Sequence, residues 1–283
     1  MAEHRKTRIL INAALAILEV EQPMTVRQLF YRLVSVGHIM NTRQEYQRVS
    51  VVMTTAREDG RCPFEYIVDR SRPEYAPNLF TDAAEYGRTV KNAYRKDYWS
   101  AQPNHVEVWV EKDAVIGSIQ EVTNDLGVTV RVGRGFLSTT RTYEIAQHFS
   151  RIDKPITVFY LGDHDPSGHD IERDLQTRIL KQSTRLFDVE RLAIFARDIA
   201  AFGLPPLRIK DADQRARQFR QEHGTECVEL DALPPTELRR RITSAIYDLI
   251  DLELWGRAIA VEKVELASIQ AAVASWPRAA EQS

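Results

Sequence analysis

The sequence predicts an α/β protein in which a small helical domain precedes a domain built on a mostly parallel sheet. Three observations support this class. From residue 105 onward, short β-branched runs alternate with helical segments, as in βαβ units. Before that point three helical patterns fill the first 60 residues, and after residue 205 helical patterns predominate. A length of 283 residues is enough for two compact domains and a helical C-terminal extension.

Composition is that of an ordinary globular protein, with 43% hydrophobic and 28% charged residues. No apolar run approaches the ~20 residues of a transmembrane helix. The first residues lack the apolar core and the small-residue cleavage site of a secretory signal. Only two cysteines occur, Cys62 and Cys227, which speaks against a disulfide framework or a zinc ribbon. We therefore expect a cytoplasmic protein without a membrane partner.

The net charge of −2 argues neither for nor against nucleic acid, but its distribution is uneven. Residues 1–72 hold 11 Lys and Arg against 8 Asp and Glu, so the negative charge lies in the rest of the chain. A mildly basic front and an acidic rear are compatible with a DNA-binding head and a metal-binding body.

The first 75 residues have the pattern of three helices and a strand. Residues 5–21 have helical spacing, Thr25 is a candidate N-cap for a second helix ending at Gly37, and a third helix is expected over 45–59. The stretch FEYIVDRS (64–71) has the composition of a strand. These parts predict a winged-helix domain over 1–75, with a generic small helical domain as the alternative. In a winged helix the third helix would enter a groove, and nearby arginines would reach phosphates: Arg61, Arg70 and Arg72.

The remaining chain divides into a linker, a sheet domain and an extension. We expect a linker over 76–104 with one helix around 82–98. The sheet domain, over 105–200, has expected strands at 106–111, 128–135, 156–163 and 192–195, with helices at 114–127, 139–152 and 168–182 between them. Residues 201–283 are expected to extend this body with helices and a DALPP turn.

Two of the predicted strands end on acids. Glu111 closes the strand at 106–111, and Asp163 closes the strand at 156–163 with Asp165 just beyond. In open α/β sheets ligands bind outside the carboxyl ends of the strands, and side chains at i and i+2 of an extended segment point the same way. Unpaired carboxylates this close repel each other unless a cation is present. Oxygen ligands of this kind suit Mg²⁺, so these acids are a candidate magnesium site.

A structural role is the alternative for the same acids. Asp163 would then cap the following helix, and Asp165 would pair with an arginine. The presence of Glu111 at the end of a second strand favours the metal site. His164 and His169 flank it, but two histidines among hard oxygen ligands do not make a zinc site.

Tyr31, on the second helix, is a candidate nucleophile. Helical spacing groups the apolar side chains of that helix on one face, which predicts that Phe30 packs inward while Tyr31 and Arg27 share an outer surface. A tyrosine hydroxyl has a pKa of about 10, so its activation needs a nearby cation or base. Arg27 would also stabilise charge on a phosphate. The alternative is a surface tyrosine stacked on an arginine.

Together these segments resemble a known enzyme family. VEVWVEKDAVIGSI and LGDHDPSGHDI resemble the two signature segments of the Toprim domain, the second in the form found in the A subunit of topoisomerase VI and the meiotic double-strand-break protein. TVRQLFYRL resembles that family's catalytic segment on a winged helix. The order of the domains agrees, and the resemblance covers roughly residues 20–200.

The resemblance implies a fold, a reaction and partners. The fold is a winged helix followed by a Toprim domain with a Rossmann-like sheet. The reaction is that of a DNA topoisomerase of type IIB: Tyr31, assisted by Arg27, would cleave double-stranded DNA and form a 5′-phosphotyrosine, while Glu111, Asp163 and Asp165 would bind Mg²⁺. The protein would be a nucleoid-associated homodimer, with a separate ATPase subunit as a further partner.

This sequence also departs from the family. Phe30 replaces the first of the two tyrosines that many relatives carry, and no Walker-type loop is present. We also expect the chain to lack the N-terminal segment that contacts the ATPase subunit in the two-subunit enzymes. The chain therefore resembles a compact, stand-alone relative of the A subunit. A Toprim endonuclease that activates water, with Tyr31 incidental, is the nearest alternative, and a non-catalytic DNA-binding module is another.

Overall fold

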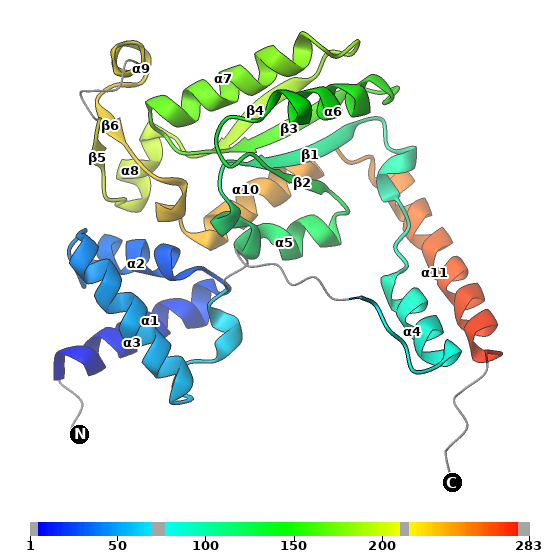
Figure 1. Ribbon diagram of the computed structural model, residues 1–283, viewed down its shortest axis with the longest axis horizontal. Coiled ribbons are helices and arrows are strands. Elements are labelled where there is room, and N and C mark those ends of the chain that lie inside the picture. Colours follow the sequence, from blue (N-terminus) through cyan, green and yellow to red (C-terminus); the bar gives the residue numbers. More distant parts are fainter. Residues whose placement is uncertain (1–4, 69–76, 210–214, 277–283) are drawn as a thin grey trace. The chain divides into compact units, whose positions relative to one another are not determined.

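The computed structural model describes residues 5–68, 77–209 and 215–276, and the chain forms two compact units (Figure 1). The first unit combines residues 1–72 with 106–248, and the second combines 73–105 with 249–283. These units do not coincide with the four predicted segments, whose limits stay predictions about domain organisation.

A four-stranded parallel sheet forms the centre of the first unit, which confirms the α/β class. The strand order is β2-β1-β3-β4. The strands are β1 (His105–Val110), β2 (Thr129–Val132), β3 (Ile156–Leu161) and β4 (Asp188–Ala193). The fourth strand begins at Asp188, before the predicted 192, because its exposed half carries alternating charged residues that conceal the strand pattern in the sequence.

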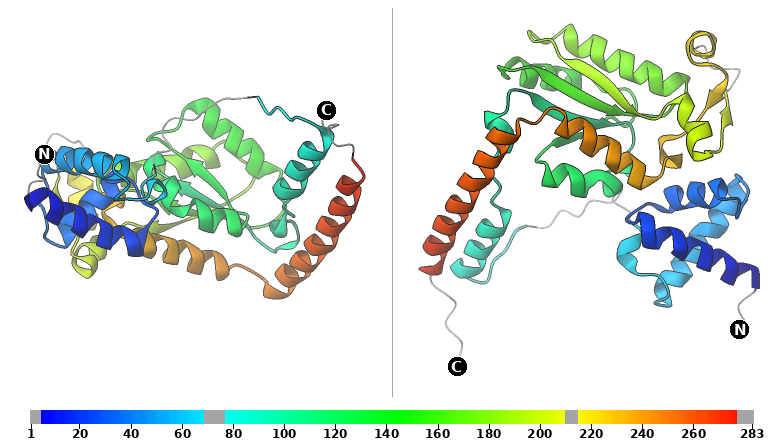
Figure 2. Two further views of the ribbon diagram at one scale, coloured as in Figure 1. Left: turned by 90° about the horizontal axis from the view of Figure 1, so that it is seen from below. Right: turned by 180° about the vertical axis from the view of Figure 1, so that it is seen from behind.

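Helices cover both faces of this sheet (Figure 1, Figure 2). On one face lie α6 (Thr139–Ser150) and α7 (Pro166–Leu180), which pack over a core that includes Trp109, Phe149 and Tyr160. On the other face lie α5 (Ile116–Asp125) and α10 (Pro235–Tyr247), which contact each other. Burial on both faces explains why β3 is almost continuously apolar in sequence.

The first helices of this unit agree with the sequence prediction. They are α1 (Arg5–Glu21), α2 (Val26–Ser35) and α3 (Arg43–Glu58), and they contact one another. Thr25 caps α2 in a reciprocal capping box with Gln28. After α2 the chain turns at Gly37, which has a φ of 77° that favours glycine.

The strand predicted at 64–71 is wrong for its described part. Phe64–Tyr66 form a 3₁₀ turn, and Ile67 makes only an isolated bridge with Met24. Met24 directly precedes the cap of α2, so the partner segment is too short to extend the ladder. Residues 69–71 lie outside the described residues, as do Arg70 and Arg72, and Arg61 pairs with Asp59.

The rest of the first unit follows β4. It comprises α8 (Ala196–Phe202), β5 (Leu207–Arg208), α9 (Ala216–His223), β6 (Glu226–Cys227), the 3₁₀ turn η4 (Leu230–Ala232) and α10. The buried Asp198 of α8 binds both terminal nitrogens of Arg241 on α10, at 2.7 and 2.9 Å. This ion pair fixes α10 to α8, the helix that follows β4.

The second unit is a helical pair. It consists of α4 (Ala83–Ala93), the 3₁₀ turn η2 (Tyr98–Ala101) and α11 (Leu252–Ala274). The Tyr98 and Trp255 rings lie 4.7 Å apart, and the Tyr94 hydroxyl donates to Glu265 at 2.5 Å. The helix predicted around 82–98 is therefore present but ends at Ala93. Among the described helices of either unit, none combines the length and apolar character needed to cross a bilayer.

Candidate functional site: an acidic centre beside Tyr31

Strand ends in the first unit bring Glu111 next to Asp163. The parallel strands β1 and β3 are neighbours, and Glu111 N–H donates to Leu161 O at 2.9 Å. The Asp163 N–H donates in turn to Glu111 Oε2 at 2.9 Å. Both side chains are buried. Burial, and next the charge of Asp163, raise the pKa of Glu111 to about 7.

Gly168 makes this approach sterically possible. A Cβ at this position would lie 2.3 Å from Asp163 O and 3.2 Å from Glu111 Oε2. Any other residue would force the turn between β3 and α7 away from Glu111. The glycine of the DPSG segment is thus explained by close packing.

Asp163 accepts two strong hydrogen bonds. Its Oδ2 lies 2.5 Å from Lys112 Nζ, and its Oδ1 accepts from Leu230 N–H at 2.9 Å. Burial raises the pKa of Asp163, although Lys112 lowers it. Burial disfavours the ionised form of Asp163, and the positive charge of Lys112 beside it stabilises that carboxylate.

Asp165 has a different role from the one considered as the structural alternative. It is Asp165, and not Asp163, that caps α7, because its Oδ1 accepts from Gly168 N–H at 2.7 Å. Asp165 is half-buried and its charge still contributes to the raised pKa of Glu111. The three predicted acids therefore share one electrostatic environment.

The donor set of this centre fits Mg²⁺. All three side chains offer hard oxygen ligands, although Lys112 occupies Asp163 Oδ2 and would have to give way to a metal ion there. Glu111, Asp163 and Asp165 would hold such an ion. Among the described residues, the carboxylate oxygens of these three acids do not all lie within 4.8 Å of one another, so a shared ion would require the side chains to move closer together.

Tyr31 is buried, so the predicted outward position is wrong. Its residue exposure is 6%, and that of Phe30 is 4%. The reason is that α2 packs on two sides: against α1 and α3, and on its other side against η4, about 200 residues later in the chain. Tyr31 nevertheless borders a cavity of about 240 Å³, which is also lined by Arg27, Phe30, Asn41, Thr42, Arg43 and Tyr46.

Arg27 lies beside Tyr31 as the helical spacing predicts. Its guanidinium carbon lies 5.8 Å from the centre of the Tyr31 ring, and its side chain is 44% exposed. Burial and then Glu229 raise the pKa of Tyr31 to about 12, while Arg27 acts in the opposite direction. The phenol is therefore protonated at neutral pH in this conformation.

Two further carboxylates belong to the centre and escape the sequence prediction. Glu229 forms an ion pair with Arg27, and its Oε2 lies 3.7 Å from Lys112 Nζ. Asp231 is fully buried, with an oxygen 3.6 Å from Arg27 Nε. A signal exists in the sequence: VELDALPP repeats the spacing of two acids one residue apart that DHDPSG has. A continuous series of charged contacts, Arg27–Glu229–Lys112–Asp163, thus joins α2 to the acidic centre.

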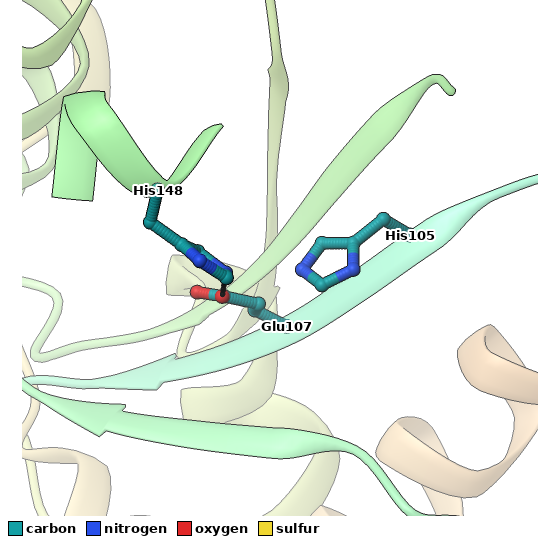
Figure 3. A group of neighbouring side chains, drawn as sticks. All are labelled: His105, Glu107 and His148. Carbon is teal, nitrogen blue, oxygen red and sulfur yellow. Dashed lines mark ion pairs between the residues drawn. The ribbon is translucent and has the colours of Figure 1, made fainter. Parts of the chain in front are cut away.

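A second group could hold a metal ion. Ligand atoms of His105, Glu107 and His148 all lie within 4.8 Å of one another, and Figure 3 shows both imidazoles beside the carboxylate. Both Glu107 oxygens also bind Arg131, at 2.6 and 2.8 Å, and Oε2 accepts from Trp109 Nε1 at 2.8 Å. A cation here would share the carboxylate with Arg131. The sequence prediction missed this group because its residues carry no recognisable spacing.

Comparison with protein-family models gave no match, and comparison with curated proteins gave none either.

Proposed function

We propose that the protein is a Mg²⁺-dependent DNA-cleaving enzyme of the type IIB topoisomerase A-subunit kind, with Tyr31 as nucleophile. One observation carries the proposal: Arg27, which lies beside the Tyr31 ring, is joined to the acidic centre by the series of charged contacts Arg27–Glu229–Lys112–Asp163. In this proposal residues 1–75 are a winged helix and the sheet domain is a Toprim domain.

Each side chain has a defined task in the proposed reaction. The Tyr31 oxygen forms a bond to the phosphorus of the DNA backbone, and the bond from phosphorus to the 3′ oxygen breaks. The phenol loses its proton as the bond forms, and the 3′ oxygen gains one, so the step releases no net proton. Arg27 orients the phosphate and stabilises its developing charge. Glu111, Asp163 and Asp165 would hold Mg²⁺, which supplies charge stabilisation at the phosphate.

The protonated, buried state of Tyr31 bears on how cleavage begins. A pKa of about 12 makes the phenol a weak nucleophile. Arg27 lowers this pKa but is engaged by Glu229. We infer that the exposed part of Arg27 binds a DNA phosphate in the cavity beside Tyr31, which brings the phosphorus next to the phenol while Glu229 keeps the guanidinium in place. In this proposal the protein is a cytoplasmic, nucleoid-associated homodimer that acts on double-stranded DNA. A separate ATPase subunit would be its partner for strand passage.

The same burial favours a second candidate function. A Toprim endonuclease uses the acidic centre to activate water, and a buried, neutral Tyr31 would then be structural. In that case cutting leaves free DNA ends without a covalent intermediate. A non-catalytic DNA-binding module would use neither group.

One experiment separates these functions. Supercoiled plasmid is incubated with the protein and Mg²⁺, stopped with detergent, and analysed with and without protease. The leading proposal predicts protein-linked 5′ ends that Tyr31→Phe abolishes, while the exposed control Tyr143→Phe leaves them. Cutting that survives Tyr31→Phe identifies the nuclease. Absence of cutting with any divalent ion identifies the binding module, and in that case combining Asp163→Asn with Asp165→Asn should leave the function of the protein unchanged.

A further inference from the structure

The segment Glu229–Asp231 lies between the tyrosine-bearing helix and the acidic centre. It follows β6 and enters η4, which contacts α2. On its other side the Leu230 N–H donates to Asp163 Oδ1 at 2.9 Å. One short segment therefore contacts both parts of the site through backbone and packing.

Glu229 is placed between two cations from different elements. Its Oε2 accepts from Arg27 Nη2 of α2 and lies 3.7 Å from Nζ of Lys112, which follows β1. The Glu229 side chain is 20% exposed, so water screens these interactions only in part. Arg27 lies beside Tyr31 and Lys112 binds Asp163, so both cations belong to the site of the proposed function.

Asp231 is a buried acid with unsatisfied oxygens. Its side chain has no exposed surface, and neither carboxylate oxygen has a hydrogen-bond partner among the described residues. Its nearest positive group is Arg27 Nε at 3.6 Å. Burial raises the pKa of Asp231 to about 6, while Lys112 and Arg27 lower it. A buried acid without hydrogen bonds is costly, which calls for a role beyond stability.

We propose that Glu229 and Asp231 are positioning residues that fix Arg27 against Tyr31 and Lys112 against Asp163. The inference rests on the proposed function, because it assigns these acids to the same site. Glu229 accepts from Arg27 Nη2 and Asp231 lies beside Arg27 Nε, so both acids lie along the same edge of the planar guanidinium group. The group is thereby held beside the Tyr31 ring and at the rim of its cavity.

If Glu229 instead inhibited the site, its removal would change the cleavage rate in the opposite direction. If Glu229 merely occupied Arg27 and Lys112 in place of a DNA phosphate, its removal would release both cations and speed cleavage. If the acids position the cations, removal leaves the guanidinium on a flexible side chain and slows the chemical step. Loss of a negative charge from the site strengthens or preserves DNA binding in either case. The rate of cleavage therefore distinguishes the two roles.

The test compares Glu229→Gln and Asp231→Asn with the exposed control Glu226→Gln. Adduct formation is followed in single turnover at saturating DNA, and DNA affinity is measured separately without divalent ions. We expect the rate to fall about 10- to 100-fold in both variants, with affinity equal or higher, and Glu229→Asp to recover part of the rate. A rate at or above that of the unchanged protein overturns the proposal. Using two isosteric variants guards against one that fails to fold.

A second readout separates this inference from the proposed function. In protein without DNA, the NMR signal of the Arg27 Nε–H group, assigned through Arg27→Lys, reports on its environment. We expect both acid variants to shift this signal and Glu226→Gln to leave it unchanged. If the unchanged protein forms no adduct, the proposed function fails, and a shifted signal still supports the anchoring of Arg27. An Arg27 signal that neither variant moves overturns the inference.

Discussion

Lys112 and Asp163 form an ion pair of 2.5 Å at the carboxyl edge of the sheet. Asp163 has a side-chain exposure of only 7%, so its charge depends on this partner and on the Leu230 N–H. The pair links the end of β1 to the end of β3 and places a positive charge where a metal ion would otherwise neutralise Asp163.

Replacing Lys112 tests whether a cation is required there. Lys112→Met leaves Asp163 buried without its counter-charge, which we expect to cost about 2–4 kcal/mol of unfolding free energy without divalent ions. Mg²⁺ should restore much of this loss, since it supplies the missing charge. Thermal unfolding with and without Mg²⁺ measures both effects. The exposed Lys181→Met is the control, and an equal response to Mg²⁺ in both variants would contradict the prediction.

The raised pKa of Glu111 makes stability depend on pH. The carboxyl has an ordinary pKa of 4.5 and a pKa of about 7 in the folded protein. The folded state therefore binds this proton more tightly, so its stabilising contribution is present below about pH 4.5 and is lost as the pH rises through 7. Without divalent ions, we expect the free energy of unfolding to fall by on the order of 1–3 kcal/mol across this window.

Urea unfolding at a series of pH values provides the measurement. Glu111→Gln should flatten the dependence on pH between 5 and 7, whereas the exposed Glu121→Gln should not. Mg²⁺ should stabilise the protein more at pH 8 than at pH 5, because ionised carboxylates bind it. An unchanged slope in Glu111→Gln would show that another group is responsible.

Two glycines make a matched pair for testing the β3–α7 turn. Gly168→Ala puts a methyl group 2.3 Å from Asp163 O, so we expect a loss of about 1–3 kcal/mol and of the stabilisation by Mg²⁺. Gly256→Ala on α11 meets nothing within 4 Å, and should stabilise by about 0.5–1 kcal/mol through helix propensity. Chemical unfolding of the two variants should therefore give changes of opposite sign. Equal changes would mean that the turn tolerates a side chain.

The sequence predicts features that depend on neighbouring residues better than features that depend on residues far apart in the chain. Thr25 and the alternation of strands and helices are local signals, and the elements they predict are present. The cap of α7 was also within reach: Pro166 occupies the first helical position, which marks Asp165 as the N-cap. The burial of Tyr31 was not, because it depends on η4 packing against α2 across about 200 residues. Periodicity identifies one buried face and cannot show that a later segment covers another.

The group around Glu107 predicts a response to zinc. Arg131→Met removes the cation that binds both oxygens of the fully buried Glu107, which should cost about 3–5 kcal/mol. Two histidines and a glutamate are a typical zinc donor set, whereas Mg²⁺ prefers oxygen ligands. We expect Zn²⁺ to raise the melting temperature of Arg131→Met and Mg²⁺ not to do so. Adding His148→Ala should abolish the effect of Zn²⁺. A zinc response that survives this second change would place the ion elsewhere.

Arg240 and Arg241 are neighbours in sequence and differ sharply in what they support. Arg241 binds both oxygens of Asp198, whose side chain is 2% exposed, and it also binds the Leu192 carbonyl. The Arg240 side chain is 66% exposed, and among the described residues it binds only Glu237. Arg241→Ala leaves a buried carboxylate without its counter-charge, so we expect a loss of about 3–5 kcal/mol. Arg240→Ala should cost less than about 1 kcal/mol, as exposed ion pairs do. Because α10 leads directly from η4, loosening Arg241 should also weaken the stabilisation by Mg²⁺, which thermal unfolding of both variants measures. Similar losses in the two variants would mean that Asp198 finds another partner.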